Sequence, residues 1–209
     1  QSMARRSDHS REQIREMALA AAESIVSDLG YTHLSARKVA TAIGYTVGTL
    51  YLVFDNLDDL VLQVNGRTLD RLHAQMVEDQ ARCKDARDRL LQLGHTYIRF
   101  ADKHPHCWEM IFESRFPQAQ GMPEWFREKV ARMFSLVEEA LKPLAKNHTS
   151  AEIAQAARAL WSGVHGICIL AITNKLDVAG VASVQDLAQS LMSNYLTGFI
   201  AETKQSSKL

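Results

Sequence analysis

The sequence predicts an all-α protein with a short N-terminal helical part and a larger C-terminal helical part. Two observations support this fold class. Apolar residues recur at every third or fourth position along most of the 209-residue chain, as they do on one face of a helix. No segment alternates apolar and polar residues with β-branched side chains, as a half-buried strand would. A chain of this length can bury one large core or two smaller ones.

The overall composition is ordinary for a globular protein and does not indicate a partner. Lysine and arginine total 24, as do aspartate and glutamate, so the charge balance does not point to nucleic acid. No run of about 18 apolar residues is present, and no charged segment followed by an apolar one opens the chain. We therefore expect no membrane partner and a cytoplasmic location. Three scattered cysteines, Cys83, Cys107 and Cys168, do not suggest a disulfide framework.

The chain opens with an amphipathic helix, predicted over residues 14–29. Its apolar residues fall on one stripe with the three-and-four spacing of a helix that packs on one side. Asp8 or Ser10 can cap the start of this helix. Gly30 provides the left-handed residue that ends many helices. A short loop follows before the next helical pattern begins.

Two shorter helices come next and are separated by a tight turn. Ser35 caps the first of them, Thr46 caps the second over residues 47–54, and Gly44 lies in the turn between. A glycine there permits the backbone reversal, where a Cβ atom would clash. Two short helices joined by a turn of three or four residues that contains glycine are typical of a helix-turn-helix.

The rest of the chain predicts longer helices separated by proline and glycine breaks. These helices are expected over residues 56–81, 85–103, 105–115, 124–146, 150–175 and 183–202. Asn56, Ser150 and Ser183 are the expected caps of three of them. Pro143 is expected to kink or end the helix that contains it, because proline removes a backbone donor.

Three short motifs follow one another through the helix-turn-helix. Ala-x-x-x-Gly covers residues 40–44, Gly-Thr-x-Tyr-x-x-Phe covers residues 48–54, and Asp-Asp-Leu covers residues 58–60. With the amphipathic helix before them, they resemble the DNA-binding signature of the tetracycline-repressor family. The resemblance implies a helix-turn-helix DNA-binding domain over residues 1–55 and a ligand-binding and dimerisation domain over residues 56–209.

Small and hydroxyl-bearing residues start the second helix of the motif, which is the recognition helix in a helix-turn-helix. They let the helix approach the edges of the bases, and their hydroxyl and methyl groups can contact phosphate or thymine. Basic residues of the preceding helix and of the N-terminal arm can contact the phosphate backbone or the minor groove. The predicted DNA contacts are Arg5, Arg6, Arg37, Lys38, Thr46, Val47, Gly48, Thr49 and Tyr51.

Two positions depart from the usual pattern of the family. The family commonly has a lysine where this chain has Leu57, and an aromatic residue or histidine where this chain has Val53. Both family residues usually contact the phosphate backbone of the DNA. The departures therefore predict weaker DNA binding, or compensation by Arg5, Arg6 and Lys38.

The C-terminal part carries two features that bear on ligand binding and assembly. Trp-Ser-Gly-Val-His-Gly at residues 161–166 resembles a tryptophan-histidine-glycine motif in one subgroup of the same family. The last two long helices are apolar and carry glycines, so they can pair with their copies as a four-helix bundle across a twofold axis, as the family does. The residues predicted for this homodimer contact are Leu187, Leu191, Tyr195 and Phe199.

An aromatic-rich middle segment is expected to enclose a cavity. Apolar walls with few polar groups are the usual composition of a ligand site, whereas the same residues at helical spacing also suit a filled core. The resemblance favours the cavity and implies a small-molecule effector, with a histidine as the polar group of the wall. The predicted wall residues are Trp108, Phe112, Phe116, Trp125, Phe126, Trp161 and His165.

The resemblance implies a one-component transcriptional repressor whose binding to double-stranded operator DNA is controlled by a small, mostly apolar effector. The alternative is a helical protein–protein adaptor that keeps the fold without operator binding, which Leu57 and the neutral charge favour. His106 and Cys107 suggest a metal site, but they point in different directions on a helix, so we predict no metal and no cofactor. No phosphate-binding glycine loop, nucleophile motif or carboxylate pair predicts an enzyme.

Overall fold

The computed structural model describes residues 9–114, 121–181 and 183–201, and the regular structure in these ranges is entirely helical, as predicted. The α-helices are α1 (Arg11–Leu29), α2 (Ala36–Ala42), α3 (Val47–Leu50), α4 (Leu57–Gln80), α5 (Ala86–Lys103), α6 (Pro105–Glu113), α7 (Glu124–Leu141), α8 (Ser150–Ile172), α9 (Lys175–Val178) and α10 (Val184–Ala201). Short 3-10 turns cover Tyr31–His33 and Lys142–Leu144. No helix in the described ranges is both long enough and apolar enough to cross a membrane.

The described residues form two compact units. The first comprises the residues up to Thr68 together with His104–Phe126, and the second comprises Leu69–Lys103 together with the residues from Arg127 onward. The long helix α4 contributes residues to both units. The predicted division into a DNA-binding domain (residues 1–55) and a ligand-binding and dimerisation domain (residues 56–209) concerns function rather than packing. It stays a prediction.

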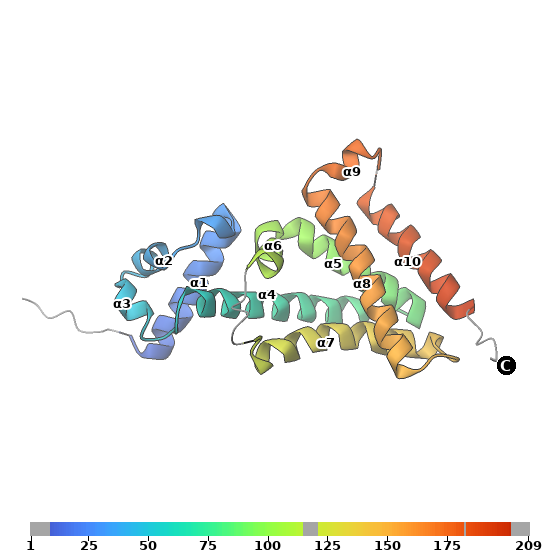
Figure 1. Cartoon of the computed structure of the whole chain (residues 1–209), viewed down its shortest axis with the longest axis horizontal. Coiled ribbons are helices and arrows are strands. Elements are labelled where there is room, and N and C mark those ends of the chain that lie inside the picture. Colours follow the sequence, from blue (N-terminus) through green and yellow to red (C-terminus); the bar gives the residue numbers. More distant parts are fainter. Residues whose placement is uncertain (1–8, 115–120, 182, 202–209) are drawn as a thin grey trace, which may run out of the picture. The chain divides into compact units, whose positions relative to one another are not determined.

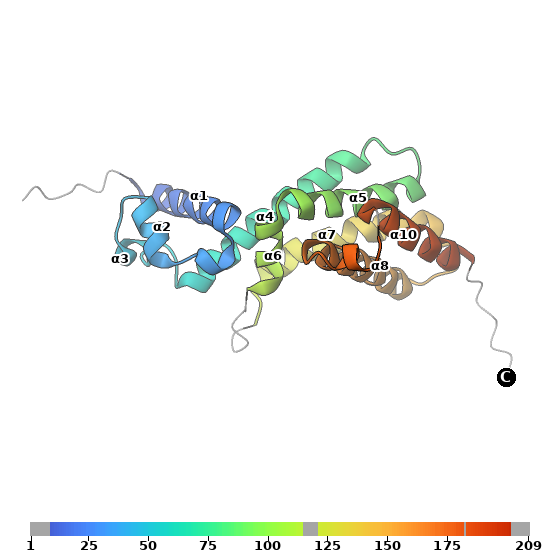
Figure 2. The same cartoon turned by 90° about the horizontal axis from the view of Figure 1, so that it is seen from above.

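The first unit is built around α1, which lies beside α2 and α3 in both views (Figures 1 and 2) and also contacts α6. Apolar side chains from these helices and from the start of α4 form one buried cluster, because this packing removes them from water. The larger members of the cluster are Ile14, Leu19, Val26, Val39, Ile43, Leu50, Phe54, Leu60, Val61, Val64 and Met110. This shared core fixes the two short helices of the helix-turn-helix on α1.

Local signals in the sequence place the helix ends of the first unit. Ser10 caps α1, Ser35 caps α2 and Thr46 caps α3, each accepting a backbone N–H three residues on. Gly44 has a φ of +75°, as its place in the turn requires. A Cβ atom on Gly44 would meet nothing within 4 Å, so the clash expected from the sequence is wrong. Glycine is favoured there by the positive φ alone.

The recognition helix is shorter than predicted, because α3 ends at Leu50 and residues 51–53 form a turn. Leu52 and Val53 donate to carbonyls three residues back, which tightens the chain after the helix. Only 1 % of Leu50 and 2 % of Phe54 are exposed. The two buried side chains therefore anchor both ends of the turn.

The long helix α8 begins on a cap that the sequence analysis missed. Thr149 accepts the N–H of Glu152 at 3.3 Å, and the Glu152 carboxylate accepts the N–H of Thr149 at 2.5 Å. This reciprocal capping box makes Thr149 the N-cap, so the prediction of Ser150 is wrong. The helix also ends at Ile172, earlier than expected, and Asn174 follows with a φ of 55°. Asparagine is one of the few residues that adopt this left-handed conformation readily.

The second unit packs α5, α8 and α10 against one another, and α8 and α10 lie side by side in orange and red (Figure 1). Gly163 permits this close approach, since a Cβ atom there would lie 2.6 Å from Leu191 Cδ2. Gly94 on α5 is equally close to α10, where a Cβ atom would lie 2.3 Å from Met192 Sδ. As predicted, α7 stops short of Pro143, which lies in a 3-10 turn.

Candidate functional site

The surface of α3 and the residues just after it carries mostly small and polar side chains, while Leu50 and Phe54 of the same segment face the core. The predicted contact residues here are Thr46, Val47, Gly48, Thr49 and Tyr51, all exposed or half-buried. Tyr51 is 44 % exposed, in contrast to its buried neighbour Leu50. The Oγ1 atoms of Thr46 and Thr49 lie 3.0 Å apart at the start of the helix. The segment therefore presents hydroxyl groups on the outside, while the buried Leu50 and Phe54 hold it in place.

The remaining predicted DNA contacts lie on α2 or before the described chain. Arg37 and Lys38 are exposed on α2, which packs against α3. The two helices thus present basic and hydroxyl-bearing side chains from adjoining elements. Arg5 and Arg6 fall outside the described residues.

The two residues that depart from the family pattern contribute to packing. Val53 and Leu57 are half-buried against the core of the first unit. Valine and leucine at these positions therefore add apolar contacts under the recognition helix. Neither side chain carries a polar group that could bind phosphate.

A cavity of about 50 Å³ lies in the second unit, between α4, α5, α7, α8 and α10. Its wall is apolar and includes Gly94, Tyr97, Leu160, Trp161, Met192 and Leu196. Water needs on the order of 10–15 Å³ per molecule by a comparable measure, so the space is larger than a gap for one water. Trp161 is the predicted wall residue that lines it. In the sequence, the one sign that two helices approach each other closely here is a glycine, Gly94, within the helical pattern of α5.

His165, also predicted for the wall, does not itself line this cavity but contacts two residues that do, Tyr97 and Trp161. The Nδ1 atom of His165 is 2.9 Å from the hydroxyl oxygen of Tyr97, and the imidazole stacks on Trp161 with ring centroids 5.1 Å apart. Burial lowers the pKa of His165, so the imidazole is neutral at neutral pH. A neutral imidazole and a phenol can each donate and accept a hydrogen bond. The Tyr97–His165 pair can therefore form a hydrogen bond with either a donor or an acceptor group of a ligand.

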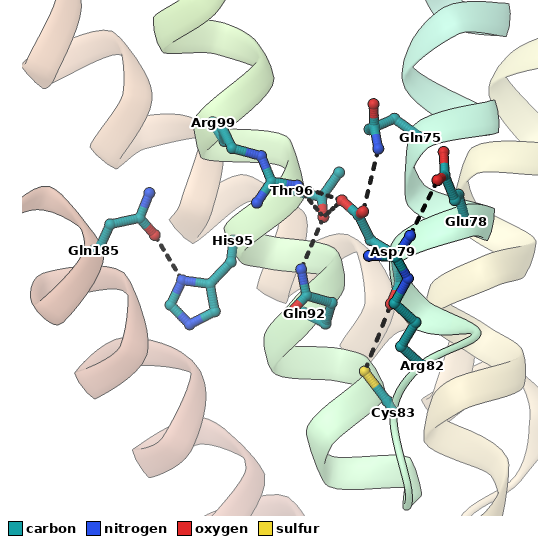
Figure 3. A network of polar contacts seen from close by, with 10 residues as sticks. All are labelled: Gln75, Glu78, Asp79, Arg82, Cys83, Gln92, His95, Thr96, Arg99 and Gln185. Atoms are coloured by element: carbon teal, nitrogen blue, oxygen red, sulfur yellow. Dashed lines mark hydrogen bonds and ion pairs between the residues drawn. The ribbon is translucent and has the colours of Figure 1, made fainter.

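A polar network holds α4 to α5 next to the cavity (Figure 3). The Asp79 carboxylate on α4 accepts the hydroxyl of Thr96 at 2.7 Å, the guanidinium of Arg99, and the amide of Gln75 at 3.1 Å. Burial acts to raise the pKa of Asp79, but these hydrogen bonds and the Arg99 charge outweigh it and lower the pKa. The carboxylate is therefore ionised at neutral pH, and both of its oxygen atoms accept hydrogen bonds. Met76, one turn before Asp79, lines the cavity.

A second polar contact holds α5 to α10. The imidazole of His95 lies between two glutamine amides, with Nδ1 2.6 Å from Gln185 and Nε2 2.7 Å from Gln189 (Figure 3 draws the first). Polar contacts thus link α5 to α4 and to α10. The cavity-lining residues Gly94 and Tyr97 lie on this helix, so the shape of the wall depends on both contacts.

The other predicted wall residues lie in the first unit and do not line this cavity. Trp108 is fully buried, with its ring centroid 5.0 Å from that of Phe112. Trp125 and Phe126 pack edge to face at 5.6 Å. The structure brings these residues together in pairs rather than around one space. Phe116 lies outside the described residues.

Phe199, predicted for the dimer contact, belongs to the core of its own chain. Only 8 % of the residue is exposed, and its ring stacks on His148 with centroids 3.9 Å apart. The carbonyl oxygen of Phe199 can only accept a hydrogen bond, so His148 Nε2, which lies 2.7 Å away, donates to it. This contact anchors the end of α10.

The other predicted dimer residues are more accessible. Leu191 on α10 is 38 % exposed, and Leu187 and Tyr195 are half-buried. On α8, Ile169 and Leu170 expose 39 % and 41 % of their surface. Neither residue is among the contacts predicted from the sequence, because the spacing of apolar residues along α8 does not show which side of the helix its own chain covers.

The histidine–cysteine segment at the start of α6 has structural partners. His106 Nδ1 is 3.0 Å from the carbonyl oxygen of Ser27, and Cys107 is buried in the core of the first unit. Within the described ranges, no group of three or more His, Cys, Asp or Glu residues is arranged to hold a metal ion.

Two protein-family models match the chain. The model described as "Bacterial regulatory proteins, tetR family" matches residues 18–64, and the model described as "Tetracyclin repressor-like, C-terminal domain" matches residues 90–195. A curated relative, an uncharacterized HTH-type transcriptional regulator of Mycobacterium tuberculosis, is 28 % identical over 178 residues. That match covers 84 % of this chain and 76 % of the relative.

Solved structures share the fold over most of their length. A protein of unknown function from Rhodococcus sp. RHA1 has a TM-score of 0.74 at 21 % identity, covering 94 % of this chain and 98 % of that one. A TetR family transcription regulator from Marinobacter aquaeolei VT8 has a TM-score of 0.61 at 20 % identity, covering 88 % and 95 %. The regulator FadR from Bacillus subtilis, solved in complex with stearoyl-CoA, has a TM-score of 0.66 at 14 % identity, covering 88 % and 98 %.

Proposed function

Since the chain belongs to the tetracycline-repressor family and is a DNA-binding transcriptional regulator, we propose that it contacts its operator through the joint surface of α2 and α3. The observation that carries this proposal is the exposure of Tyr51 and of the threonine hydroxyls above the buried Leu50 and Phe54. Arg37 and Lys38 would neutralise phosphates beside it. The relatives and the matched domains are regulators and not enzymes, and the adaptor alternative finds no support among them.

Operator binding tests the assignment of these residues. The probes are a duplex that the wild-type protein selects from a random pool and the DNA upstream of its own gene, each measured by fluorescence anisotropy. Thr49→Ala and Tyr51→Phe should each weaken binding by about 1 kcal/mol through a lost hydrogen bond. Thr32→Ala, at an exposed threonine outside the motif, is the control and should bind as the wild type does. Unchanged affinity in both variants would remove α3 and the turn after it from the interface.

The salt dependence of binding tests the basic residues separately. Arg37→Ala should reduce the slope of log affinity against log salt by about 0.9, because one phosphate is no longer neutralised. The slope of Thr49→Ala should stay at the wild-type value. A wild-type slope in Arg37→Ala would show that this side chain makes no phosphate contact.

We also propose that a small, mostly apolar effector binds in the cavity of the second unit and controls operator binding. The apolar wall supports this class of ligand, and the Tyr97–His165 pair offers it one polar contact. The Trp161–His165 segment would then have the ligand role that the tryptophan-histidine-glycine resemblance implies. Ligand pockets commonly enclose about 300–1,000 Å³, so the effector must be small or must displace wall side chains.

A thermal-shift screen of small apolar compounds tests the effector site. Compounds that bind the folded state should raise the melting temperature of the wild-type protein. Leu160→Phe fills part of the cavity and should abolish the shift, whereas Phe112→Leu in the first unit should keep it. Equal shifts in both variants would place the binding site elsewhere.

The assembly that we propose is a homodimer. Two chains would pair through α8 and α10, so that two recognition helices could contact successive major grooves about 34–36 Å apart. The effector would alter this spacing through α4, which contributes residues to both units. The site of action would be the cytoplasm, where a repressor meets its operator.

A further inference from the structure

The side chain of Arg15 on α1 contacts both the turn after α3 and the start of α4, although Arg15 lies far from both in the sequence. Its Nη1 atom donates to the carbonyl oxygen of Val53 at 2.8 Å, and its Nη2 atom donates to Gln63 Oε1 at 2.5 Å. The guanidinium also lies over the ring of Phe54, with Cζ 5.2 Å from the centroid. One half-buried side chain thus makes two contacts with the turn after α3 and one with α4.

The partners of Arg15 are themselves fixed. Gln63 donates its amide to Asp59 Oδ1 at 2.7 Å, and Asp59 Oδ2 accepts the N–H of Asp55 at 3.1 Å. Asn56 Oδ1 accepts the N–H of Asp59 at 2.9 Å and caps α4. The turn between α3 and α4 is therefore held by a continuous set of hydrogen bonds that ends at Arg15.

A helix as short as α3 depends on such contacts at its ends. It has four residues, far fewer than the roughly 12–15 that an isolated helix needs in water. Its upstream end is fixed by the Thr46 cap and by the bond from the N–H of Tyr45 to the carbonyl of Ala40, at 2.9 Å. Downstream, the guanidinium of Arg15 holds the Val53 carbonyl with the directional geometry of a planar fork.

We propose that Arg15 is a positioning residue for operator recognition: by holding the Val53 carbonyl and Gln63, it sets the orientation of α3 and hence of Tyr51 and Thr49. This inference rests on the proposal that α3 contacts the operator. Arg15 acts through the protein backbone and makes no phosphate contact of its own. Its loss should therefore reduce the recognition of sequence and leave the attraction to phosphate unchanged.

The experiment compares operator and non-specific DNA. Arg15→Met keeps an unbranched apolar stem and removes the donors, and Arg15→Lys keeps the charge and one donor group. Binding is measured with the duplex selected by the wild-type protein and with a scrambled duplex of the same composition, over a range of salt concentrations. Circular dichroism establishes that each variant is folded at the temperature used. Arg82→Met is the matched control, because the Arg82 side chain is 76 % exposed in the second unit.

We expect Arg15→Met to bind the selected duplex on the order of tenfold more weakly, because charge-assisted hydrogen bonds are among the stronger ones. Arg15→Lys should be intermediate. Binding to the scrambled duplex and the salt slope should stay at wild-type values, since the number of neutralised phosphates is unchanged. Gln63→Met should weaken binding in the wild-type background and have little further effect in Arg15→Met, because the two side chains act through one contact.

Each other outcome overturns a defined part of the inference. Wild-type affinity in a folded Arg15→Met would reduce Arg15 to a stabilising contact. A smaller salt slope with weaker binding to both duplexes would make it a direct phosphate contact. An equal loss of affinity in Arg82→Met would mean that the change in net charge, and not the contacts of Arg15, weakens DNA binding. If Arg15→Met does not fold, Arg15→Lys and Gln63→Met decide by the same criteria. Normal binding by Tyr51→Phe and Thr49→Ala would instead contradict the proposed role of α3.

Discussion

His165 shows how a polar residue is accommodated beside an apolar cavity. Its imidazole stacks on Trp161 and is within hydrogen-bond distance of Tyr97, so it keeps a polar partner after leaving water. Burial disfavours the charged form and lowers the pKa of the ring. In the unfolded chain the same ring titrates near its ordinary value of about 6.5. Folding therefore changes its affinity for protons, which makes stability depend on pH.

The stability of the protein should fall as the pH drops below about 6.5, where the unfolded chain binds a proton that folded His165 does not. Above that pH both states are neutral at this ring, and it contributes no pH dependence. His165→Gln should therefore show a smaller loss of unfolding free energy than the wild type between about pH 7 and about pH 5.5. Urea unfolding at the two pH values measures this loss of unfolding free energy, with His33→Gln at an exposed histidine as the control. His73, whose pKa burial also lowers, should account for part of the remaining slope.

At the scale of single elements, helix starts were predictable because a cap is a local signal. Ser35, Thr46 and Ser183 each accept a backbone N–H three residues on, as their positions in the sequence indicate. Thr149 carried the same signal with Glu152, yet the adjoining Ser150 is an equally good cap by residue type. The reciprocal bond from the glutamate decides between them, and it depends on side-chain geometry.

Thr149→Ala should lower the free energy of unfolding by about 1 kcal/mol, the usual cost of losing a helix cap. Ser150→Ala removes the neighbouring hydroxyl from the first turn of the same helix and should change stability by less than about 0.5 kcal/mol. Thermal and urea unfolding of both variants measure the difference. Equal losses would mean that the capping box does not stabilise α8.

The contact between α4 and α5 should depend on the charge of Asp79. Asp79→Asn should lower the unfolding free energy at neutral pH by about 1–3 kcal/mol, since the lost bonds are to a charged acceptor. The lowered pKa means that this stabilisation is complete above the ordinary carboxyl value of about 4 and is lost as the pH falls below it. The deficit of the variant should therefore shrink in acid. Glu78→Gln, in an exposed ion pair, is the control and should have little effect.

At the scale of the whole molecule, the order and type of the helices followed from the sequence, but their pairing did not. Helical periodicity is local, whereas the cavity joins residues of five helices, among them Met76, Leu93 and Met192. Aromatic content suggested other walls, because large apolar side chains suit a filled core and a cavity equally well. Phe199 shows the same limit, since an apolar stripe does not reveal whether its own chain or a partner covers it.

The exposed apolar residues of α8 and α10 predict that a charge on this surface separates the two chains of a dimer. Leu191→Glu should dissociate the dimer, because burying an unpaired charge in an interface costs several kcal/mol, on the order of 3–5. Sedimentation velocity and circular dichroism measure assembly and folding together. Leu29→Glu, at an exposed leucine of the first unit, is the control and should leave assembly unchanged. Phe199→Glu should unfold the protein, since this ring packs within its own chain. A wild-type monomer at micromolar concentration would contradict the pairing.

The packing of Met192 over Gly94 has a consequence for the selectivity of the proposed effector site. The glycine leaves room for a thioether where any other residue would force the sulfur to move. Methionine is unbranched and polarisable, and it changes shape through its own bond rotations. This part of the wall can therefore adapt to an occupant without any shift of the helices. Discrimination here should follow the size of a compound more than its chemical class, so that unrelated compounds of similar bulk produce the same response.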